Sequence, residues 1–321
     1  VSEDRFQPTE RGGAARPGRQ GTCALKCRCL REVMVQMERI GFIGAGKVGT
    51  AFGVRLAEQG FPVVGAMDIL PDEARRFADS ISGCAAYDGA QQLADEMDFV
   101  FITTSDDAIA QVAGEVKWHE GQSVVHCSGA NSAAILEPAR KVGAHVGCMH
   151  PCNTFASVAQ SLENLPGSTF TLEAEEPVLS DLKRFAEALK GRAMMLREED
   201  KPLYHASICI ACNYMYTIVN IATDMWKHFG IDQADALSAC MPILKGTLNN
   251  LENVGFPGCL TGPIARGDVG TIRKHLQALE DKEPEIVPLY KALGLETIPI
   301  GRAKGTLTED KATQLKALFE E

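Results

Sequence analysis

The sequence is short of positive charge. Its 321 residues contain 32 Lys and Arg against 42 Asp and Glu, which gives a net charge of −10. Residues 1–36 carry seven of the cations and four of the acids, so the remainder has 25 against 38. A surface this acidic repels phosphate backbones, and nucleic acid is therefore not expected as a partner. A chain of this length exceeds one ordinary hydrophobic core, which favours two domains.

The sequence also lacks a disulfide framework. Its eleven cysteines are scattered without the spacing of a small secreted domain, and no secretory signal precedes them. This usage favours a reduced, cytoplasmic protein. Cys23, Cys27 and Cys29 match no zinc spacing, so no metal is predicted there. Residues 1–36 are rich in Gly, Arg and Pro without periodicity, and we interpret them as a disordered tail or a start assigned too early, before Met37.

Only one segment is apolar and long enough to cross a membrane. The run Leu203–Thr223 is uncharged apart from His205, but it contains Ser, Thr and Asn and lacks flanking basic clusters. It therefore predicts a helix buried within the protein rather than a membrane span. A helix that is apolar on nearly all sides often packs against a second copy of its chain, so a homodimer through the helical domain is expected.

The most informative motif is GxGxxG at Gly44, Gly46 and Gly49, directly after a short apolar run. In such a motif the glycines permit a tight turn, close approach of a pyrophosphate, and close packing of helix on strand. The phosphates then lie at the helix N-terminus. A second apolar run ends at Asp68, where a carboxylate would bind the ribose hydroxyls. The residues predicted to bind the dinucleotide are Gly44, Ala45, Gly46, Lys47, Val48, Gly49, Asp68, Thr103, Thr104 and Ser105.

The choice between NAD and NADP is predicted to lean towards NAD. Asp68 would accept hydrogen bonds from free ribose hydroxyls and repel a 2′-phosphate. Arg75 and Arg76 on the following helix leave NADP open, because a guanidinium group turned towards the ribose would bind that phosphate.

Strand and helix patterns alternate up to about residue 197. The predicted strands are Ile40–Ile43, Val63–Met67, Phe99–Thr103, Ser123–Cys127, His145–Met149, Thr169–Leu172 and Ala193–Leu196. The predicted helices are Val48–Gln59, Asp72–Ser80, Asp107–Glu115, Ser132–Lys141 and Val178–Leu189. This order predicts an α/β fold with a doubly wound, mostly parallel Rossmann-like sheet. Strand patterns end near Lys201, so we expect a Rossmann domain over residues 37–199 and an all-α domain over 200–321.

Five stretches resemble a family of Rossmann-like oxidoreductases whose helical second domain is known only as a domain of unknown function. They are IGFIGAGKVG at 40–49, HCSGA at 126–130, MHPCNTF at 149–155, YHASICIACN at 204–213 and LTGPIARGD at 260–268. More distantly, the layout is similar to hydroxyacid dehydrogenases, pyrroline-5-carboxylate reductase and ketopantoate reductase. The resemblance implies a nucleotide domain, a helical dimerising domain and a substrate between them.

The chain departs from these relatives at two points. Cysteines stand at 127, 148, 152 and 212, where small or varied residues are expected. The hydroxyacid-dehydrogenase pattern also has a lysine one helical turn before an asparagine, whereas the fourth residue before Asn213 is Cys209. A lysine-based mechanism therefore does not carry over from that pattern.

Three loops are expected at the carboxyl ends of the strands, where a doubly wound sheet binds its ligands. In the first, 103–107, Ser105 or Asp106 would either contact the nucleotide or cap the next helix. In the second, Ser128 and the Gly129 N–H would hold a substrate carbonyl or carboxylate. In the third, His150 would donate a proton or hold a turn. Cys148, His150 and Cys152 alternate along one strand face, but zinc sites use pairs joined by turns, so no metal is predicted.

The helical domain contributes His205, Asn213, Thr261 and Arg266 to the predicted site. His205 is the first candidate for the proton donor, with Tyr204 and His150 as alternatives. Asn213 would orient the carbonyl or bond to another helix. Arg266 would hold a carboxylate together with Thr261, from the partner subunit of a dimer, or would pair with Asp268.

The sequence therefore predicts a cytoplasmic NAD- or NADP-dependent oxidoreductase or dehydrogenase acting on a small carbonyl substrate, with a 2-oxo or hydroxy acid such as ketopantoate in range. One alternative is the reduction of an imine or a deazaflavin. Another is a non-catalytic sensor or scaffold that binds dinucleotide only as a ligand. The small-molecule substrate, the direction of the reaction and the proton donor stay open at this point.

Overall fold

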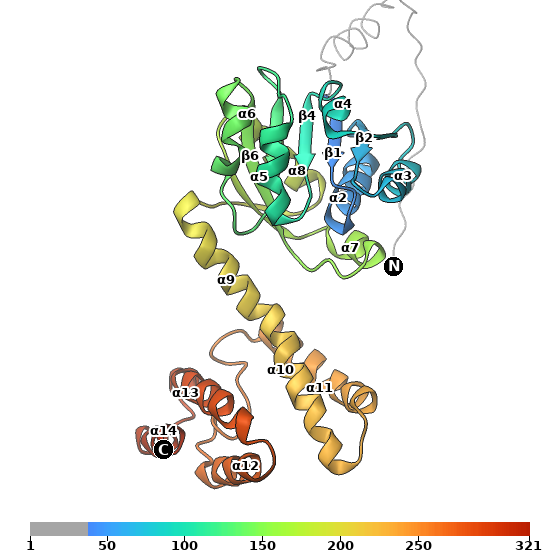
Figure 1. Cartoon of the computed structure of the whole chain (residues 1–321). Helices are drawn as coiled ribbons and strands as arrows, with labels where there is room; N and C mark the ends of the chain where they lie inside the picture. Colours follow the sequence, from blue (N-terminus) through green and yellow to red (C-terminus); the bar gives the residue numbers. More distant parts are fainter. Residues whose placement is uncertain (1–37) are drawn as a thin grey trace, which may run out of the picture. The chain divides into compact units, whose positions relative to one another are not determined.

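The computed structural model describes residues 38–321, and Figure 1 shows their helices and strands. The expectations for residues 1–36, including the tail and its three cysteines, lie outside this range. The described residues form two compact units, the first ending at Ile208 and the second running from Cys209 to Glu321. The boundary falls within one helix, α9 (Lys201–Ala211).

The first unit is built on one eight-stranded sheet with the order β3-β2-β1-β4-β5-β6-β7-β8. Its strands are β1 (Ile40–Ile43), β2 (Val63–Met67), β3 (Ala85–Tyr87), β4 (Phe99–Ile102), β5 (Ser123–His126), β6 (His145–Cys152), β7 (Thr169–Ala174) and β8 (Arg192–Met195). Strands β1 to β6 run parallel, β7 is antiparallel to β6, and β8 is parallel to β7. The predicted doubly wound, mostly parallel sheet is confirmed.

All seven predicted strands are present, but β3 was missed. It has only three residues at the sheet edge, and Ala85 and Ala86 are exposed. A strand this short and exposed contains no hydrophobic run from which it could be predicted.

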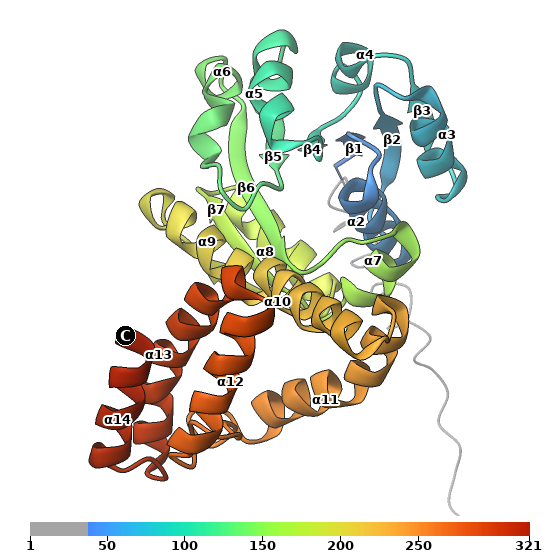
Figure 2. The ribbon, with the colours of Figure 1, turned by 60° about the horizontal axis from the view of Figure 1, so that its bottom comes forward.

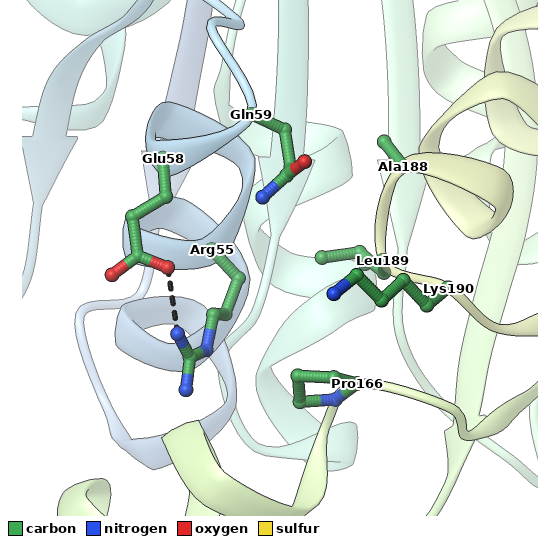
Figure 3. Close-up of a pocket in the computed structure, with 7 residues that line it drawn as sticks. All are labelled: Arg55, Glu58, Gln59, Pro166, Ala188, Leu189 and Lys190. Carbon is green, nitrogen blue, oxygen red and sulfur yellow. Dashed lines mark hydrogen bonds and ion pairs between the residues drawn. The ribbon is translucent and has the colours of Figure 1, made fainter.

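Helices cover both faces of this sheet (Figures 1 and 2). They are α2 (Lys47–Glu58), α3 (Pro71–Asp79), α4 (Ala90–Ala94), α5 (Asp106–Glu115), α6 (Glu137–Lys141), α7 (Val158–Asn164) and α8 (Val178–Ala188). One hydrophobic cluster joins α2, α3 and α8 to the sheet through residues such as Phe52, Phe77 and Phe185. A second joins α4, α5 and α6 to the opposite face through residues such as Leu93 and Ile109. The predicted helix 132–141 begins as a 3₁₀ turn, Ala133–Leu136, before α6.

Aromatic packing fixes the strands that carry the glycine motif. Phe101 on β4 is fully buried and stacks on Phe42 of β1, with ring centroids 5.0 Å apart. It also contacts the rings of Phe52, Phe99 and Phe185. Such a cluster leaves β1 and β4 one low-energy arrangement, so the loops at their carboxyl ends have fixed starting points.

The second unit is helical throughout. Its elements are the end of α9, then α10 (Asn213–Asp224), α11 (Gln233–Asn253), α12 (Val269–Lys282), α13 (Val287–Lys304) and α14 (Glu309–Glu320). Helices α12, α13 and α14 share a core that includes Ile272, Ile298 and Phe319. Helix α10 contacts α11, and two short 3₁₀ helices, Met225–Phe229 and Pro284–Ile286, lie in the connections between the longer helices.

The prediction that Leu203–Thr223 is a helix buried within the protein is wrong for the single chain. The segment forms two helices, α9 and α10, interrupted at Cys212, and many of its large apolar side chains are exposed. By length and composition Glu198–Phe229 could span a membrane, at a mean hydropathy of 1.3, and only 6% of its apolar window is buried. Among residues 38–321 it is the one such segment, and a single one is weak evidence for a membrane span.

Candidate active site

The glycine motif forms an open cradle at the start of α2. Gly44 has a φ of +107°, and a Cβ there would lie 2.6–2.8 Å from the Thr103–Thr104 backbone. A Cβ on Gly49 would overlap the Gly44 carbonyl oxygen. A Cβ on Gly46, by contrast, would meet nothing within 4 Å, and no side chain caps the helix. Space and unpaired N–H groups therefore coincide at Gly46, which suits an anion such as a pyrophosphate.

Asp68 ties the second strand to this loop. One carboxylate oxygen accepts the Ala45 N–H at 2.8 Å and the other accepts the Leu70 N–H at 2.9 Å. Each oxygen keeps a lone pair for a further donor, such as a ribose hydroxyl. Thr103 completes the loop, since its hydroxyl donates to the Gly44 carbonyl at 2.6 Å.

The other residues considered for cofactor binding contact only their neighbours in the sequence. The Thr104 hydroxyl donates to the Ser105 carbonyl at 3.2 Å. Ser105 occupies the N-cap position of α5 but makes no side-chain capping bond there. Arg75 and Arg76 are exposed and form ion pairs with Asp72 and Glu73 of their own helix.

Ser128 lies buried in the loop after β5, and its hydroxyl is fully engaged. It donates to Asp106 at 2.9 Å and accepts the N–H groups of Ala130 and Asn131 at 3.3 and 3.0 Å. Asp106 thus binds this loop and does not cap its own helix, which answers the capping question left open by the sequence. A hydroxyl with its one proton already donated has no donor left for a substrate. In this structure Ser128 shapes the loop.

His126, at the end of β5, is held as a neutral imidazole. Its Nδ1 accepts the Ser128 N–H at 3.1 Å, and its Nε2 lies 3.1 Å from the Ser132 carbonyl oxygen. Only the tautomer with a proton on Nε2 satisfies both contacts. Burial, aided by the positive charge of Lys201, lowers the pKa of His126 to about 4.

Three of the predicted or alternative donors meet around Gly129. The His150 Nδ1 lies 2.9 Å from the Tyr204 hydroxyl, and the rings of His150 and His205 have centroids 6.1 Å apart. A Cβ on Gly129 would lie 2.7 Å from His205 and 2.8 Å from His150, so only glycine fits beneath these imidazoles. Burial and the neighbouring His205 lower the pKa of His150 to about 4, and burial raises the pKa of Tyr204 to about 12.

The remaining predicted residues belong to the second unit. Asn213 is exposed at the start of α10. Thr261 and Arg266 are exposed in the loop before α12. Asp268 caps α12, accepting the Thr271 N–H at 3.0 Å and its hydroxyl at 2.7 Å. Asp268 is therefore the N-cap of α12.

Sequence reasoning missed Lys201 and Glu173. The Lys201 side chain is only 2% exposed, and its ammonium nitrogen lies 2.9 Å from the Cys148 sulfur and 3.3 Å from Glu173 Oε2. The available signal was Pro202, which marks a helix start and so places Lys201 at the junction rather than in a solvated linker. Within the described residues, no group of three His, Cys, Asp or Glu side chains could hold a metal ion.

The two depressed histidine pKa values predict acid sensitivity. The unfolded chain binds protons to His126 and His150 near pH 6.5, whereas the folded chain binds them only near pH 4. Stability should therefore rise with pH between about 4 and 6.5, and the melting temperature should fall by several degrees as the pH is lowered through this window. Calorimetric melts of wild type and His126→Asn measure it. An equal slope in both proteins over this window would contradict the assignment to His126.

Family models match both parts of the chain. A Rossmann-like domain model matches residues 29–151, and the model of a domain of unknown function (DUF2520) matches residues 168–297. The chain thus joins a Rossmann-like domain to a DUF2520 domain, and the resemblance drawn from its motifs is confirmed. A search of curated proteins found no match.

Solved structures share this two-part fold. A Bacteroides fragilis protein, provisionally assigned as an NADP oxidoreductase, is 22% identical with a TM-score of 0.67, over 82% of this chain and 98% of its own. Protein TM1727 from Thermotoga maritima is 24% identical with a TM-score of 0.65, over 83% and 99%. Plasmodium falciparum pyrroline carboxylate reductase, solved with NADP bound, is 14% identical with a TM-score of 0.55, over 88% and 98%. At these identities the likeness establishes the fold.

Proposed function

We propose that the chain is an NAD(P)-dependent oxidoreductase that transfers a hydride between nicotinamide and a small carbonyl or imine substrate. One observation carries this proposal. The open cradle at Gly46 follows the carboxyl end of β1, and in the same unit His150 lies near the carboxyl end of β6, where Tyr204 and His205 of α9 meet it. Ligand binding and chemistry in doubly wound sheets take place at that edge.

The residues fit a dinucleotide. The helix N-terminus at Gly46 would hold the pyrophosphate, and the free lone pairs of Asp68 would accept the ribose hydroxyls. The bound nicotinamide supplies or accepts the hydride. The protein's own part is then to orient the substrate and to move one proton at its oxygen or nitrogen, for which His205, Tyr204 and His150 are the candidates.

Two substrate classes remain in the proposal. A 2-oxo or hydroxy acid, ketopantoate-like in size, suits a site in which the Gly129 N–H binds a carboxylate. A cyclic imine is favoured by the likeness to pyrroline carboxylate reductase, because a pyrroline ring contains a C=N bond. Assaying the purified protein with NADH and NADPH against panels of 2-oxo acids and cyclic imines tests both classes. Failure of every pair to oxidise cofactor would leave dinucleotide binding as the function.

We further propose that the protein works in the cytoplasm as a homodimer through its helical unit. Helices α10 and α11 expose large apolar side chains, among them Tyr214, Ile218 and Ile243. An exposed apolar surface of this kind is typical of a protein–protein interface. A second copy offers the same surface and would bury it symmetrically. Arg266, which is exposed, would then act on the partner's substrate, while Asn213 would orient the carbonyl and Thr261 would contact the substrate. Sedimentation analysis should find a dimer at micromolar concentration.

Asp68 should make the protein prefer NADH. We expect a dissociation constant for NADH about tenfold below that for NADPH, because the carboxylate repels a 2′-phosphate. Asp68→Asn keeps an acceptor for only one of the two backbone N–H groups and removes the charge, so it should narrow the ratio of the two dissociation constants. Titration of cofactor fluorescence measures all four constants. Tighter binding of NADPH by the wild type would overturn the preference.

A further inference from the structure

A closed ring of polar contacts surrounds the loop Cys127–Ser132. On one side the Ser132 hydroxyl and the Ala133 N–H both donate to Glu173 Oε1, at 2.7 and 3.0 Å. Glu173 Oε2 then faces the Lys201 ammonium group at 3.3 Å, and that group donates to the Cys148 sulfur at 2.9 Å. The Cys148 thiol closes the ring by donating to the Ser128 carbonyl at 3.2 Å.

Lys201 is the one cation in this ring, and it joins three elements. It starts α9, Glu173 lies on β7, and Cys148 lies opposite Glu173 on β6. Glu173 Oε2 makes no hydrogen bond within residues 38–321, so its compensation comes from the charge of Lys201. The ammonium group can satisfy the carboxylate and the sulfur together only when α9 starts at this point. Tyr204 and His205 follow one turn later on the same helix.

We propose that Lys201 is a positioning residue of the candidate active site, whose ammonium group holds the Ser128–Gly129 loop and the start of α9 in one arrangement. The proposal rests on the oxidoreductase function for its catalytic meaning. The structural role of Lys201 does not depend on that function, because its contacts with Glu173 and Cys148 exist without a ligand. Lys201 touches no substrate in this scheme and acts through the loop, His150 and Tyr204.

The same charge acts on His150. A cation near an imidazole disfavours its protonated form, so Lys201 works with burial to keep His150 neutral. A neutral His150 can share one proton with the Tyr204 hydroxyl. The titratable or charged groups around His150 are Asp106 on α5, His126 on β5, Cys148 and Cys152 on β6, Glu173 on β7, and Lys201, Tyr204 and His205 on α9.

The test compares Lys201→Met with the double variant Lys201→Met/Glu173→Gln. Lys201→Met alone leaves Glu173 with an unpaired charge and should lower the melting temperature. The double variant removes both charges and should regain much of that loss. Lys183→Met, which replaces an exposed lysine on α8, is the matched control.

The deciding readout is the pKa of His150, followed by NMR titration of its imidazole in the free protein. It should move upward by about 0.5 or more in both Lys201 variants and stay at the wild-type value in Lys183→Met. A purely structural role predicts that the double variant, once its stability is regained, titrates like the wild type, and this result would overturn the proposal. So would an unchanged His150 in Lys201→Met.

Activity then separates the two proposals. If the chain is the proposed oxidoreductase, the double variant should lose turnover about tenfold with little change in KM for the cofactor, and its acid limb should follow the shifted His150. If no substrate is ever reduced but the NMR shift occurs, the oxidoreductase function fails while the role of Lys201 stands. If turnover and its pH profile match the wild type in the double variant, Lys201 is not a positioning residue.

Discussion

Replacing His205 by asparagine is expected to lower turnover by about 10²–10⁴-fold, the usual contribution of general acid catalysis. The neighbouring groups make poorer donors at neutral pH. The pKa of His150 is held at about 4 by burial, so its imidazole carries no spare proton there, and the pKa of Tyr204 is raised to about 12. His205 is the remaining imidazole of the cluster, and histidine is the side chain most used to transfer protons near neutral pH. The ring of His205 packs edge to face with that of His150, next to Gly129, and both histidines belong to the first unit.

Steady-state kinetics with an identified substrate, together with cofactor titrations, provide the measurement. His205→Asn and Asn213→Ala should both reduce kcat while the dissociation constant of the cofactor stays near that of the wild type. Tyr204→Phe removes the hydroxyl that faces His150 and should cost about tenfold, less than His205→Asn. A larger loss in Tyr204→Phe than in His205→Asn would move the donor to Tyr204. Full turnover in both His205→Asn and Asn213→Ala would mean that these residues form no part of the site.

The fold of the first unit follows closely from its sequence because its signals are local. The runs 40–43 and 63–67 are apolar, short and bounded by turn residues, and their strand limits agree with the prediction to the residue. GxGxxG adds a constraint that few other arrangements satisfy, since Gly44 and Gly49 both lie where a side chain would overlap backbone. The local sequence pattern and the tertiary packing agree here, which is why the predicted strands are correct.

The candidate site could be predicted only in part, because its key contacts join distant segments. His150 and Tyr204 are 54 positions apart, and Lys201 and Cys148 are 53 apart. No spacing rule links such residues. Cys148 was weighed as a metal ligand from its alternation with His150, whereas its neighbour in space is an ammonium group. Ser128 illustrates the same limit, since only the structure shows that Asp106 engages its hydroxyl.

The prediction that the apolar segment 203–223 is buried was wrong for a different reason. Its apolar composition predicts that water is excluded from most of its surface, but a sequence does not say which molecule would exclude it. The sequence predicted burial within the protein or against a second copy of the chain, and the described residues leave Leu203, Ile210 and Tyr214 exposed. A surface that is completed only by another molecule cannot be read from one chain.

Gly46→Val is expected to weaken dinucleotide binding by about a hundredfold or more while leaving the fold intact. The backbone at Gly46 is extended, with a φ of −73° and a ψ of −166°, so valine can adopt it without strain. A Cβ there would meet no protein atom within 4 Å. The added methyl groups would instead occupy the space through which a pyrophosphate reaches the N–H groups of α2.

Gly49→Val is the matched comparison on the same loop. Its Cβ would overlap the Gly44 carbonyl oxygen and lie 2.6 Å from the Thr103 hydroxyl, so β1, β4 and α2 would have to separate. This variant should therefore lose both thermal stability and cofactor affinity, whereas Gly46→Val should lose affinity alone. Calorimetric melts and NADH titrations on the two proteins distinguish these outcomes. Wild-type affinity in Gly46→Val would show that no phosphate approaches this loop, and the dinucleotide site would then have to be sought elsewhere in the chain.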